Sequence, residues 1–282
     1  MIYKRLILYY LFLINYFLML ARSIGIFNMF RRQFVKPASI CNLKGNYLNI
    51  VNKRIITLSP GGFKGFYMMG VCKYLKENYD LSNYIFSGAS AGAWNSLLLS
   101  FKGDINEFQN DIISMKTQKL DNLKNIEDTI KKHILEKYTS DDFQLDQLYI
   151  GTTVFENFKL KSIVYTGFEN LEDAVECCIA SSHIPYITGG LKYRYRGLAS
   201  FDGGFSEYPY LNNSYSNLHI TPSIWSSRKT IVEKLAAPNV KLSDFTTLFS
   251  RKDYDMEKLI LAGYNDAKNN KDILDRIMNS YN

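Results

Sequence analysis

Residues 83–101 read NYIFSGASAGAWNSLLLSF. The first six residues have the aromatic and β-branched character of a short buried strand, and the apolar residues of the second half recur at helical spacing. Between the two halves stand five small residues, Gly88, Ala89, Ser90, Ala91 and Gly92. A serine on such a sharp strand-to-helix turn is typical of a nucleophile elbow, in which the hydroxyl is exposed and bulky neighbours would collide. The alternative is an ordinary packing turn, and the flanking strand and helix favour the nucleophile.

A similar unit precedes this stretch. RIITLS at 54–59 predicts a strand, PGGFKG at 60–65 predicts a glycine turn, and GFYMMGVCKYLKENY at 65–79 has the apolar spacing of a helix. Two strand-turn-helix units in succession predict parallel strands, because the helix between them must cross over the sheet.

The remaining chain continues to alternate between the two kinds of element. LYIGTTVF at 148–155, SIVYTG at 162–167, ASFDGGF at 199–205 and NLHITPS at 217–223 predict strands. Residues 104–138 are charged and helical in pattern, LEDAVECCIA at 171–180 predicts a helix, and the last forty residues predict helical cover. The fold class predicted is therefore α/β, with a central, mostly parallel sheet in a three-layer domain.

Composition limits the classes of function. The 282 residues carry 34 Lys and Arg against 27 Asp and Glu, a net charge of +7 that is spread without a long basic run. This pattern gives little support to nucleic-acid binding. It fits attraction to anionic lipid headgroups at least as well. The four cysteines, Cys41, Cys72, Cys177 and Cys178, fit neither a disulfide framework nor a metal pattern. We expect packed free thiols, no metal site and no cofactor.

The N-terminus differs from the rest of the chain. Residues 6–21, LILYYLFLINYFLMLA, carry no charge and follow Lys4 and Arg5. At about 1.5 Å per residue they would span roughly 24 Å as a helix, short for a bilayer core of roughly 30 Å. A membrane anchor, a cleaved signal peptide ending near Ala21 and Ser23, and a buried helix all fit this run.

The basic residues around the apolar run indicate an orientation for a retained anchor. Arg22, Arg31, Arg32 and Lys36 follow the run and outnumber the two basic residues before it, which places the main domain on the cytoplasmic side. We therefore expect a membrane-associated protein with a single N-terminal anchor and a cytoplasmic domain, in preference to a secreted one. The predicted organisation is an anchor or signal segment at 1–28, a linker at 29–50 and a catalytic domain at 51–282.

Acyl transfer needs hydrogen-bond donors for the oxyanion of a tetrahedral intermediate. The turn after the first predicted strand, SPGGFKG at 59–65, supplies candidates because glycines leave backbone N–H groups uncovered and a helix begins there. Pro60 has no N–H, so the donors are expected at Gly61, Gly62 or Phe63. A phosphate loop is the alternative, but the spacing around Lys64 does not fit that motif.

A nucleophilic serine also needs a base. The chain has three histidines, His133, His183 and His219, and each can equally be a structural histidine. Asp202 is a more specific candidate, because it follows a predicted strand and precedes Gly203 and Gly204, which allow a tight turn and a close approach of backbone.

Three motifs in this order, GGFKGFYMMGV, GASAG and DGG, resemble the patatin-like phospholipase family over about residues 54–208. FKGFYMMGV and ASSHIPYITGGLKYRYRG are similar to its adiponutrin-like branch. The resemblance implies a Ser-Asp dyad without histidine, with Ser90 as nucleophile and Asp202 as base, and an oxyanion loop shaped by Gly61, Gly62 and Gly65. Pro60 stands where the family usually has its first glycine.

The resemblance implies hydrolysis of phospholipid or acylglycerol esters through an acyl-serine intermediate, without a metal or cofactor. The expected partner is a lipid substrate at a membrane or lipid-droplet surface. Three alternatives remain open: acyl transfer to a lipid acceptor, a non-catalytic lipid-binding protein on the same scaffold, and a Ser-Asp-His hydrolase that uses His219. Met68, Met69 and Trp94 fit either an acyl groove or, more often, core packing.

Overall fold

The structure, a computed structural model, describes residues 39–42, 53–114, 126–185, 188, 190–206, 208–211, 216–225 and 255–279. All of them belong to the compact unit Pro37–Asn282. The apolar stretch at 6–21 and most of the predicted linker lie outside the described residues.

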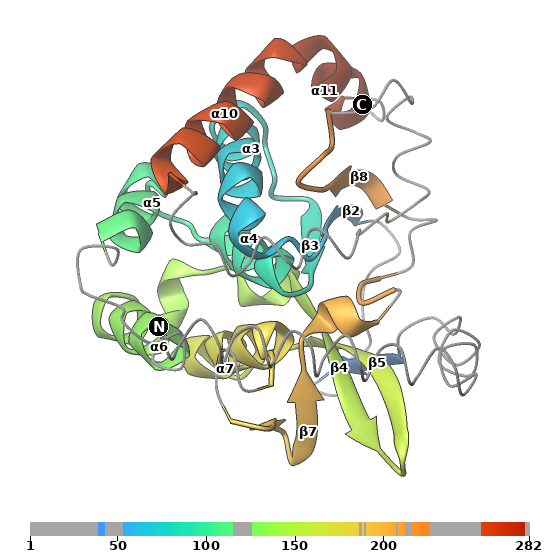
Figure 1. The fold of residues 1–282 in the computed structure, drawn as a ribbon. Coiled ribbons are helices and arrows are strands. Elements are labelled where there is room, and N and C mark those ends of the chain that lie inside the picture. Colours follow the sequence, from blue (N-terminus) through green and yellow to red (C-terminus); the bar gives the residue numbers. More distant parts are fainter. Residues whose placement is uncertain are drawn as a thin grey trace, which may run out of the picture. The chain divides into compact units, whose positions relative to one another are not determined.

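A mixed sheet forms the centre of this unit (Figure 1). Its strand order is β1-β5-β4-β3-β2-β8, and β7 and β6 continue from β4. The strands are β1 (Ser39–Asn42), β2 (Arg54–Leu58), β3 (Tyr84–Gly88), β4 (Leu148–Glu156), β5 (Lys159–Thr166), β6 (Tyr193–Tyr195), β7 (Leu198–Phe201) and β8 (Ser216–Ile220). The pairs β2-β3, β3-β4, β2-β8 and β1-β5 are parallel, so the predicted central, mostly parallel sheet is confirmed.

The antiparallel part of the sheet is the main addition to the prediction. β4 and β5 form a hairpin closed by Asn157 and Phe158, and β6 and β7 form a second hairpin. β7 pairs with the second half of β4, on the side where β3 pairs with its first half. β1 pairs with β5, although Ser39–Asn42 falls within the stretch predicted as a linker.

Helices flank the sheet. They are α3 (Gly65–Asn78), α4 (Ala91–Ser100), α5 (Ile105–Ser114), α6 (Ile126–Lys137), α7 (Leu171–Ser182), α10 (Met256–Asn269) and α11 (Lys271–Met278). α4 packs on β2, β3 and β4, α7 packs on β4, and α10 lies along α3, as Figure 1 shows. Within the described residues, no helix combines the length and the apolar character that crossing a bilayer requires.

The core lies between the sheet and these helices. One face of the strands contributes Ile56, Phe86 and Ile150 to a large buried cluster, which also holds the buried apolar side chains of all seven helices. The opposite face contributes Ile55, Ile85, Tyr149 and Val164 to a smaller cluster that Leu211 closes. This alternation follows from the two-residue period of a strand. Helical packing on the second face, which three layers require, stays a prediction.

Candidate functional site

Ser90 lies on the turn between β3 and α4, with φ 55° and ψ −125°. A positive φ is costly for a residue with a Cβ, and such strain is typical of a serine held on an elbow. Small neighbours make the turn possible: a Cβ added at Gly92 would lie 2.1 Å from the Leu58 oxygen, and one at Gly88 would lie 2.1 Å from the Gly92 oxygen. The strand before Ser90 and the helix after it are both confirmed.

Asp202 reaches Ser90 because two strands end opposite each other on β4. β3 runs parallel to β4 and its last pair is Gly88 with Ile150. β7 runs antiparallel to β4 and its last pair is Phe201 with Thr153. The residues that follow the two strands therefore converge from opposite directions over the intervening residues of β4.

The two side chains are in direct contact. The Ser90 hydroxyl donates a hydrogen bond to Asp202 Oδ2 at 2.6 Å, and the two residues are 5% and 1% exposed. Asp202 Oδ1 accepts the Gly204 N–H at 2.6 Å, so each carboxylate oxygen has a different donor. The close approach needs small residues, since a Cβ at Gly203 would lie 2.7 Å from the Ala89 Cβ and 2.5 Å from the Gly151 oxygen.

The end of α7 holds both residues in place. The Ser90 N–H donates to Ser181 Oγ at 2.8 Å, and that hydroxyl donates to the Gly151 carbonyl at 2.6 Å. Two residues later, the His183 carbonyl accepts the Asp202 N–H at 2.8 Å. The segment 181–183 therefore links the serine, the aspartate and β4. Sequence patterns do not single out Ser181, which lies in the last turn of α7 without a motif around it.

The glycine loop lies against the elbow. Gly61 precedes the 3-10 helix η1 (Gly62–Lys64), in which Gly62 has φ 51°, and α3 follows directly. Gly65 touches the elbow so closely that a Cβ there would lie 2.7 Å from the Ala91 Cβ, and its carbonyl accepts the Asn95 side-chain amide. The glycine loop therefore contacts the elbow and leads into the N-terminal end of α3, the positive end of its helix dipole.

The histidines take other positions. His219 is on β8 beside Thr57 of β2, and Thr57 in turn pairs with Ser87 of β3. Two strand spacings of about 4.8 Å separate β8 from β3, and the His219 Nδ1 lies 2.7 Å from the Thr57 hydroxyl. Burial lowers the pKa of His219 to about 4, so the ring is neutral at pH 7. His183 contributes its backbone to the site, and His133 lies on α6.

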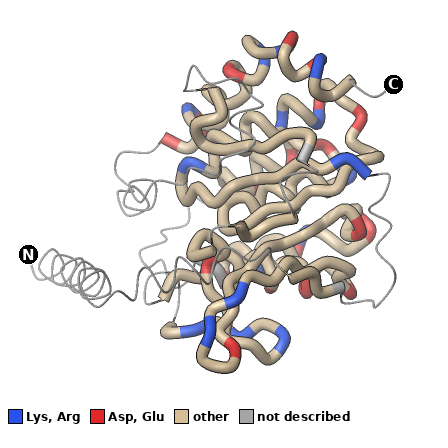
Figure 2. Tube along the Cα trace, turned by 90° about the vertical axis from the view of Figure 1, so that its right-hand side faces the viewer, with Lys and Arg blue, Asp and Glu red and all other residues tan. Residues whose placement is uncertain are grey.

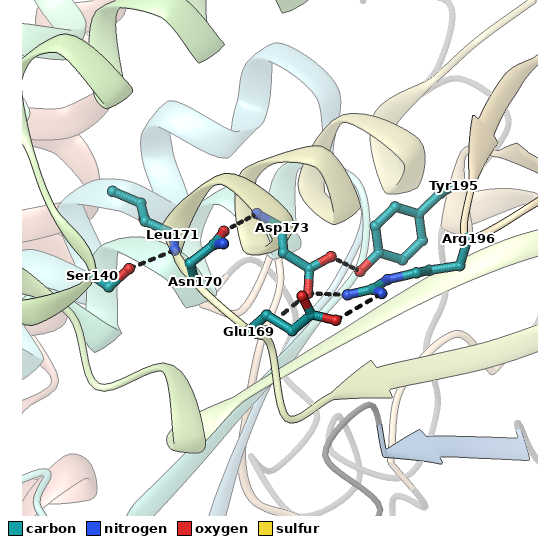
Figure 3. Close-up of polar contacts among 7 residues, drawn as sticks. All are labelled: Ser140, Glu169, Asn170, Leu171, Asp173, Tyr195 and Arg196. Carbon is teal, nitrogen blue, oxygen red and sulfur yellow. Dashed lines mark hydrogen bonds and ion pairs between the residues drawn. The ribbon is translucent and has the colours of Figure 1, made fainter.

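A salt-bridge cluster anchors the strand that carries Asp202 (Figure 3). Arg196, in the turn between β6 and β7, pairs with Glu169 and Asp173, which flank the start of α7. The hydroxyl of Tyr195 donates to the second oxygen of Asp173, and its ring packs edge-on against Tyr165. Sequence reasoning did not assign these residues. They tie the β6-β7 hairpin to the helix whose other end holds Ser90 and Asp202.

Other potentially reactive groups are structural. Cys72, Cys177 and Cys178 are free and buried, Cys41 is free and half-buried, and burial raises the pKa of the Cys72 and Cys178 thiols. These two thiols are therefore protonated and unreactive at neutral pH. Among the described residues, no cluster of His, Cys, Asp and Glu could hold a metal ion.

A cavity of about 460 Å³ lies at the opposite end of β3 from Ser90, where the chain leaves α3 and α4. Lys76 and Gln147 line it, and both donate to backbone carbonyls, Lys76 to Leu99 and Phe101 and Gln147 to Leu81 and Ser82. The Lys76 bonds join the ends of α3 and α4, and the Gln147 bonds join the segments that precede β4 and β3. The cavity lining therefore has a structural role.

Comparison with known proteins supports the resemblance over part of the chain. Residues 56–171 match the family model described as patatin-like phospholipase. The match includes the glycine loop and Ser90, stops before Asp202, and covers less than half of the 282 residues. No curated protein sequence matches the chain. The matched segment is thus similar to a patatin-like phospholipase domain, which indicates a lipid-hydrolysing esterase.

Proposed function

We propose that the chain is a lipid acyl hydrolase of the phospholipase A or acylglycerol lipase kind, in which Ser90 is the nucleophile and Asp202 is its base. The observation that carries this proposal is the 2.6 Å hydrogen bond from the Ser90 hydroxyl to Asp202 Oδ2 on a strained strand-to-helix turn. The family match at 56–171 supports ester hydrolysis of lipids. Membership of the adiponutrin-like branch belongs to the proposal and rests on the two sequence stretches that resemble it.

The proposed reaction begins with acylation of Ser90. The Ser90 oxygen attacks the ester carbonyl carbon while Asp202 takes the hydroxyl proton, and the carbonyl electron pair moves to its oxygen. The amides of Gly61, Gly62 and Phe63 stabilise this oxyanion. The intermediate then expels the alcohol, which receives the proton from Asp202, and an acyl-serine remains.

Deacylation repeats the steps with water. Asp202 takes a proton from a water molecule while the water oxygen attacks the acyl carbon. The Ser90 oxygen then leaves and takes that proton from Asp202. The products are the fatty acid and the original enzyme. A lipid alcohol in place of water would give acyl transfer through the same acyl-serine, and only the products distinguish the two reactions.

The test is a product analysis. The full chain is incubated with phospholipids and with mono-, di- and triacylglycerols, and free fatty acid and new acyl lipids are measured by mass spectrometry. We expect fatty acid release, covalent labelling of Ser90 by a fluorophosphonate, and loss of both in Ser90→Ala. Ser96→Ala is a matched control, because that serine lies on the same helix and its hydroxyl donates to the Gly92 carbonyl within that helix. Unchanged labelling of Ser90→Ala would assign the nucleophile to another residue.

We further propose that residues 6–21 hold the enzyme at a membrane, with its domain on the cytoplasmic side and its lipid substrate in that membrane or at a lipid droplet. The uncharged run and its basic flanks support this. Deleting residues 1–28 should move the protein to the soluble fraction while a short-chain soluble ester is still hydrolysed. Recovery of a secreted chain that begins after Ser23 would identify a signal peptide instead.

A further inference from the structure

The two hairpins, β4-β5 and β6-β7, project past the site in the same direction. β4 continues from the level of Ser90, near Gly151, to Glu156, which pairs with Lys159 across the first turn. In the second hairpin, Tyr195 pairs with Leu198, and Arg196 and Gly197 form the turn. Because Phe155 pairs with Ala199, the two turns end at nearly the same level. Strand geometry places this level roughly 15 Å beyond Gly151.

Phe158 at the first turn is 94% exposed. Asn157 and Phe158 have φ 50° and 59°, the two positive values of a type I′ turn, in which the second position favours glycine. The phenyl ring makes an edge contact with Phe155, which is itself 45% exposed. A large apolar side chain therefore occupies a backbone position that disfavours it and is left in water, so folding of the described residues does not account for it.

Basic residues lie on both faces of these two hairpins. Lys159, Lys161, Lys192 and Arg194 are exposed on the same two hairpins, and Figure 2 shows Lys and Arg on them at the lower end of the view. Arg194 shares one face of the sheet with Phe155, because both residues align with Ala199 of β7. Lys159 and Lys161 pair across the first hairpin with Glu156 and Val154, so they extend from the face opposite to Phe155. Lys161 forms an ion pair with Glu156, and Arg196 forms one with Glu169.

We propose that this hairpin surface, the tip that carries Phe155, Phe158, Lys159, Lys192 and Arg194, docks end-on on the surface of an anionic phospholipid bilayer. Exposed aromatic rings partition into the boundary between headgroups and acyl chains, and Lys and Arg beside them are attracted to anionic headgroups. A stable protein interface needs about 800 Å² per partner, more than two rings of about 200 Å² each supply. The observations therefore favour a lipid surface over a protein partner.

Docking in this way explains how a buried site meets its substrate. Ser90 is about four residues of strand away from Phe155, and Phe205, three residues after Asp202, is 46% exposed. The cluster of Arg196, Glu169 and Asp173 fixes the second hairpin to α7, so the surface is attached to the elements that position the serine and the aspartate. The inference rests on the proposed function, since it describes how that hydrolase reaches lipid.

The first test measures insertion directly. Full-length Phe158→Trp is mixed with vesicles of phosphatidylcholine and phosphatidylserine that carry brominated acyl chains, and the tryptophan quenching of the unsubstituted protein is subtracted. Leu261→Trp is the matched control, because Leu261 is 59% exposed on α10, away from the hairpins. We expect strong quenching at position 158 and little at 261, with a decrease in high salt and in pure phosphatidylcholine. Equal quenching at both positions, or no effect of charge and salt, overturns the proposal.

The second test separates docking from chemistry. Phe158→Ser is expected to hydrolyse vesicle lipid about tenfold more slowly and a soluble short-chain ester at the normal rate, whereas Leu261→Ser changes neither. Equal loss on both substrates would show that Phe158 acts on the fold or the site, and would overturn the docking proposal. If position 158 is quenched but the unsubstituted protein hydrolyses no ester, the proposed function fails while the docking surface stands.

Discussion

Ser90 combines an unfavourable backbone conformation with four specific contacts. Its φ of 55° costs free energy, and its N–H, its hydroxyl and the backbone on either side are held by Ser181, Asp202 and the close packing of Gly88 and Gly92. Strain of this kind persists only where surrounding contacts over-determine the conformation. Replacement of Ser90 by alanine should therefore change the structure little. Replacement of the residues that hold its backbone should change the structure more.

Asp202→Asn tests the base. Asparagine keeps the oxygen that accepts the Gly204 N–H, so the turn should survive, but it cannot take the Ser90 proton. Loss of a positioned base lowers rates on the order of 100- to 10,000-fold, and kcat on a soluble ester should fall within that range with an unchanged circular dichroism spectrum. His183→Ala and His219→Ala should each keep a substantial fraction of activity when folded. If His219→Ala folds and is as inactive as Ser90→Ala, the site is a Ser-Asp-His triad and the dyad assignment is wrong.

Ser181→Ala tests positioning. The substitution removes the acceptor of the Ser90 N–H and the donor to the Gly151 carbonyl. Leaving two buried backbone groups without these partners costs about 1–3 kcal/mol each, and we expect kcat to fall about tenfold with KM nearly unchanged. Ser182→Ala is the matched control, because the Ser182 hydroxyl bonds to its own helix and to the Trp94 indole. Equal effects of the two substitutions on kcat would mean that Ser181 only stabilises the helix.

The sequence predicts the residues of the site that stand in glycine-rich turns and misses those that hold them. The glycines around Ser90 and after Asp202 indicate sharp turns, because no other residue fits where a Cβ would lie 2.1–2.7 Å from a neighbouring atom. Ser181 and Arg196 have no such local signal. Their roles arise from contacts across 91 and 23 residues of chain, respectively, which no local pattern encodes.

Among the elements, the predicted strands and helices with long apolar patterns are confirmed, from β2 through α7. The short strands β1 and β6 were not predicted, because four or three residues cannot establish a two-residue period. The parallel direction of neighbouring strands follows from the crossover helices between them. The β6-β7 hairpin, by contrast, has no sequence signal apart from Arg196 and Gly197 in its turn. That hairpin carries Asp202 to the serine, so the least predictable element is central to the site.

Helices α3 and α10 pack so closely that their glycines are required. A Cβ added at Gly263 would lie 1.9 Å from the Tyr67 oxygen, and one at Gly70 would lie 1.9 Å from the Ile260 oxygen. Gly263→Ala should therefore push α10 away from α3 and lower the free energy of unfolding by about 1–3 kcal/mol, measured by urea denaturation. Gly190→Ala, where nothing lies within 4 Å of the added Cβ, should leave the midpoint nearly unchanged. A neutral Gly263→Ala would mean that the helices can separate without cost.

For the whole molecule, the buried histidine on β8 predicts how stability depends on pH. Burial lowers the pKa of His219 from 6.5 to about 4, because a charged ring would lose its hydration among Thr57 and Tyr210. The unfolded chain takes up the proton below pH 6.5 and the folded chain only below about 4. The contribution of His219 to stability is therefore complete above pH 6.5 and is lost as the pH falls from 6.5 to 4.

His219→Gln isolates this contribution, since glutamine does not titrate. One unit of pKa corresponds to about 1.4 kcal/mol, so the unsubstituted protein should lose on the order of 2–3 kcal/mol more than His219→Gln between pH 7 and pH 4. Urea denaturation of both proteins at several pH values measures the difference. A His219→Gln curve that runs parallel to that of the unsubstituted protein would mean that His219 is protonated in the folded state, and the neutral, structural role assigned to its ring would be wrong.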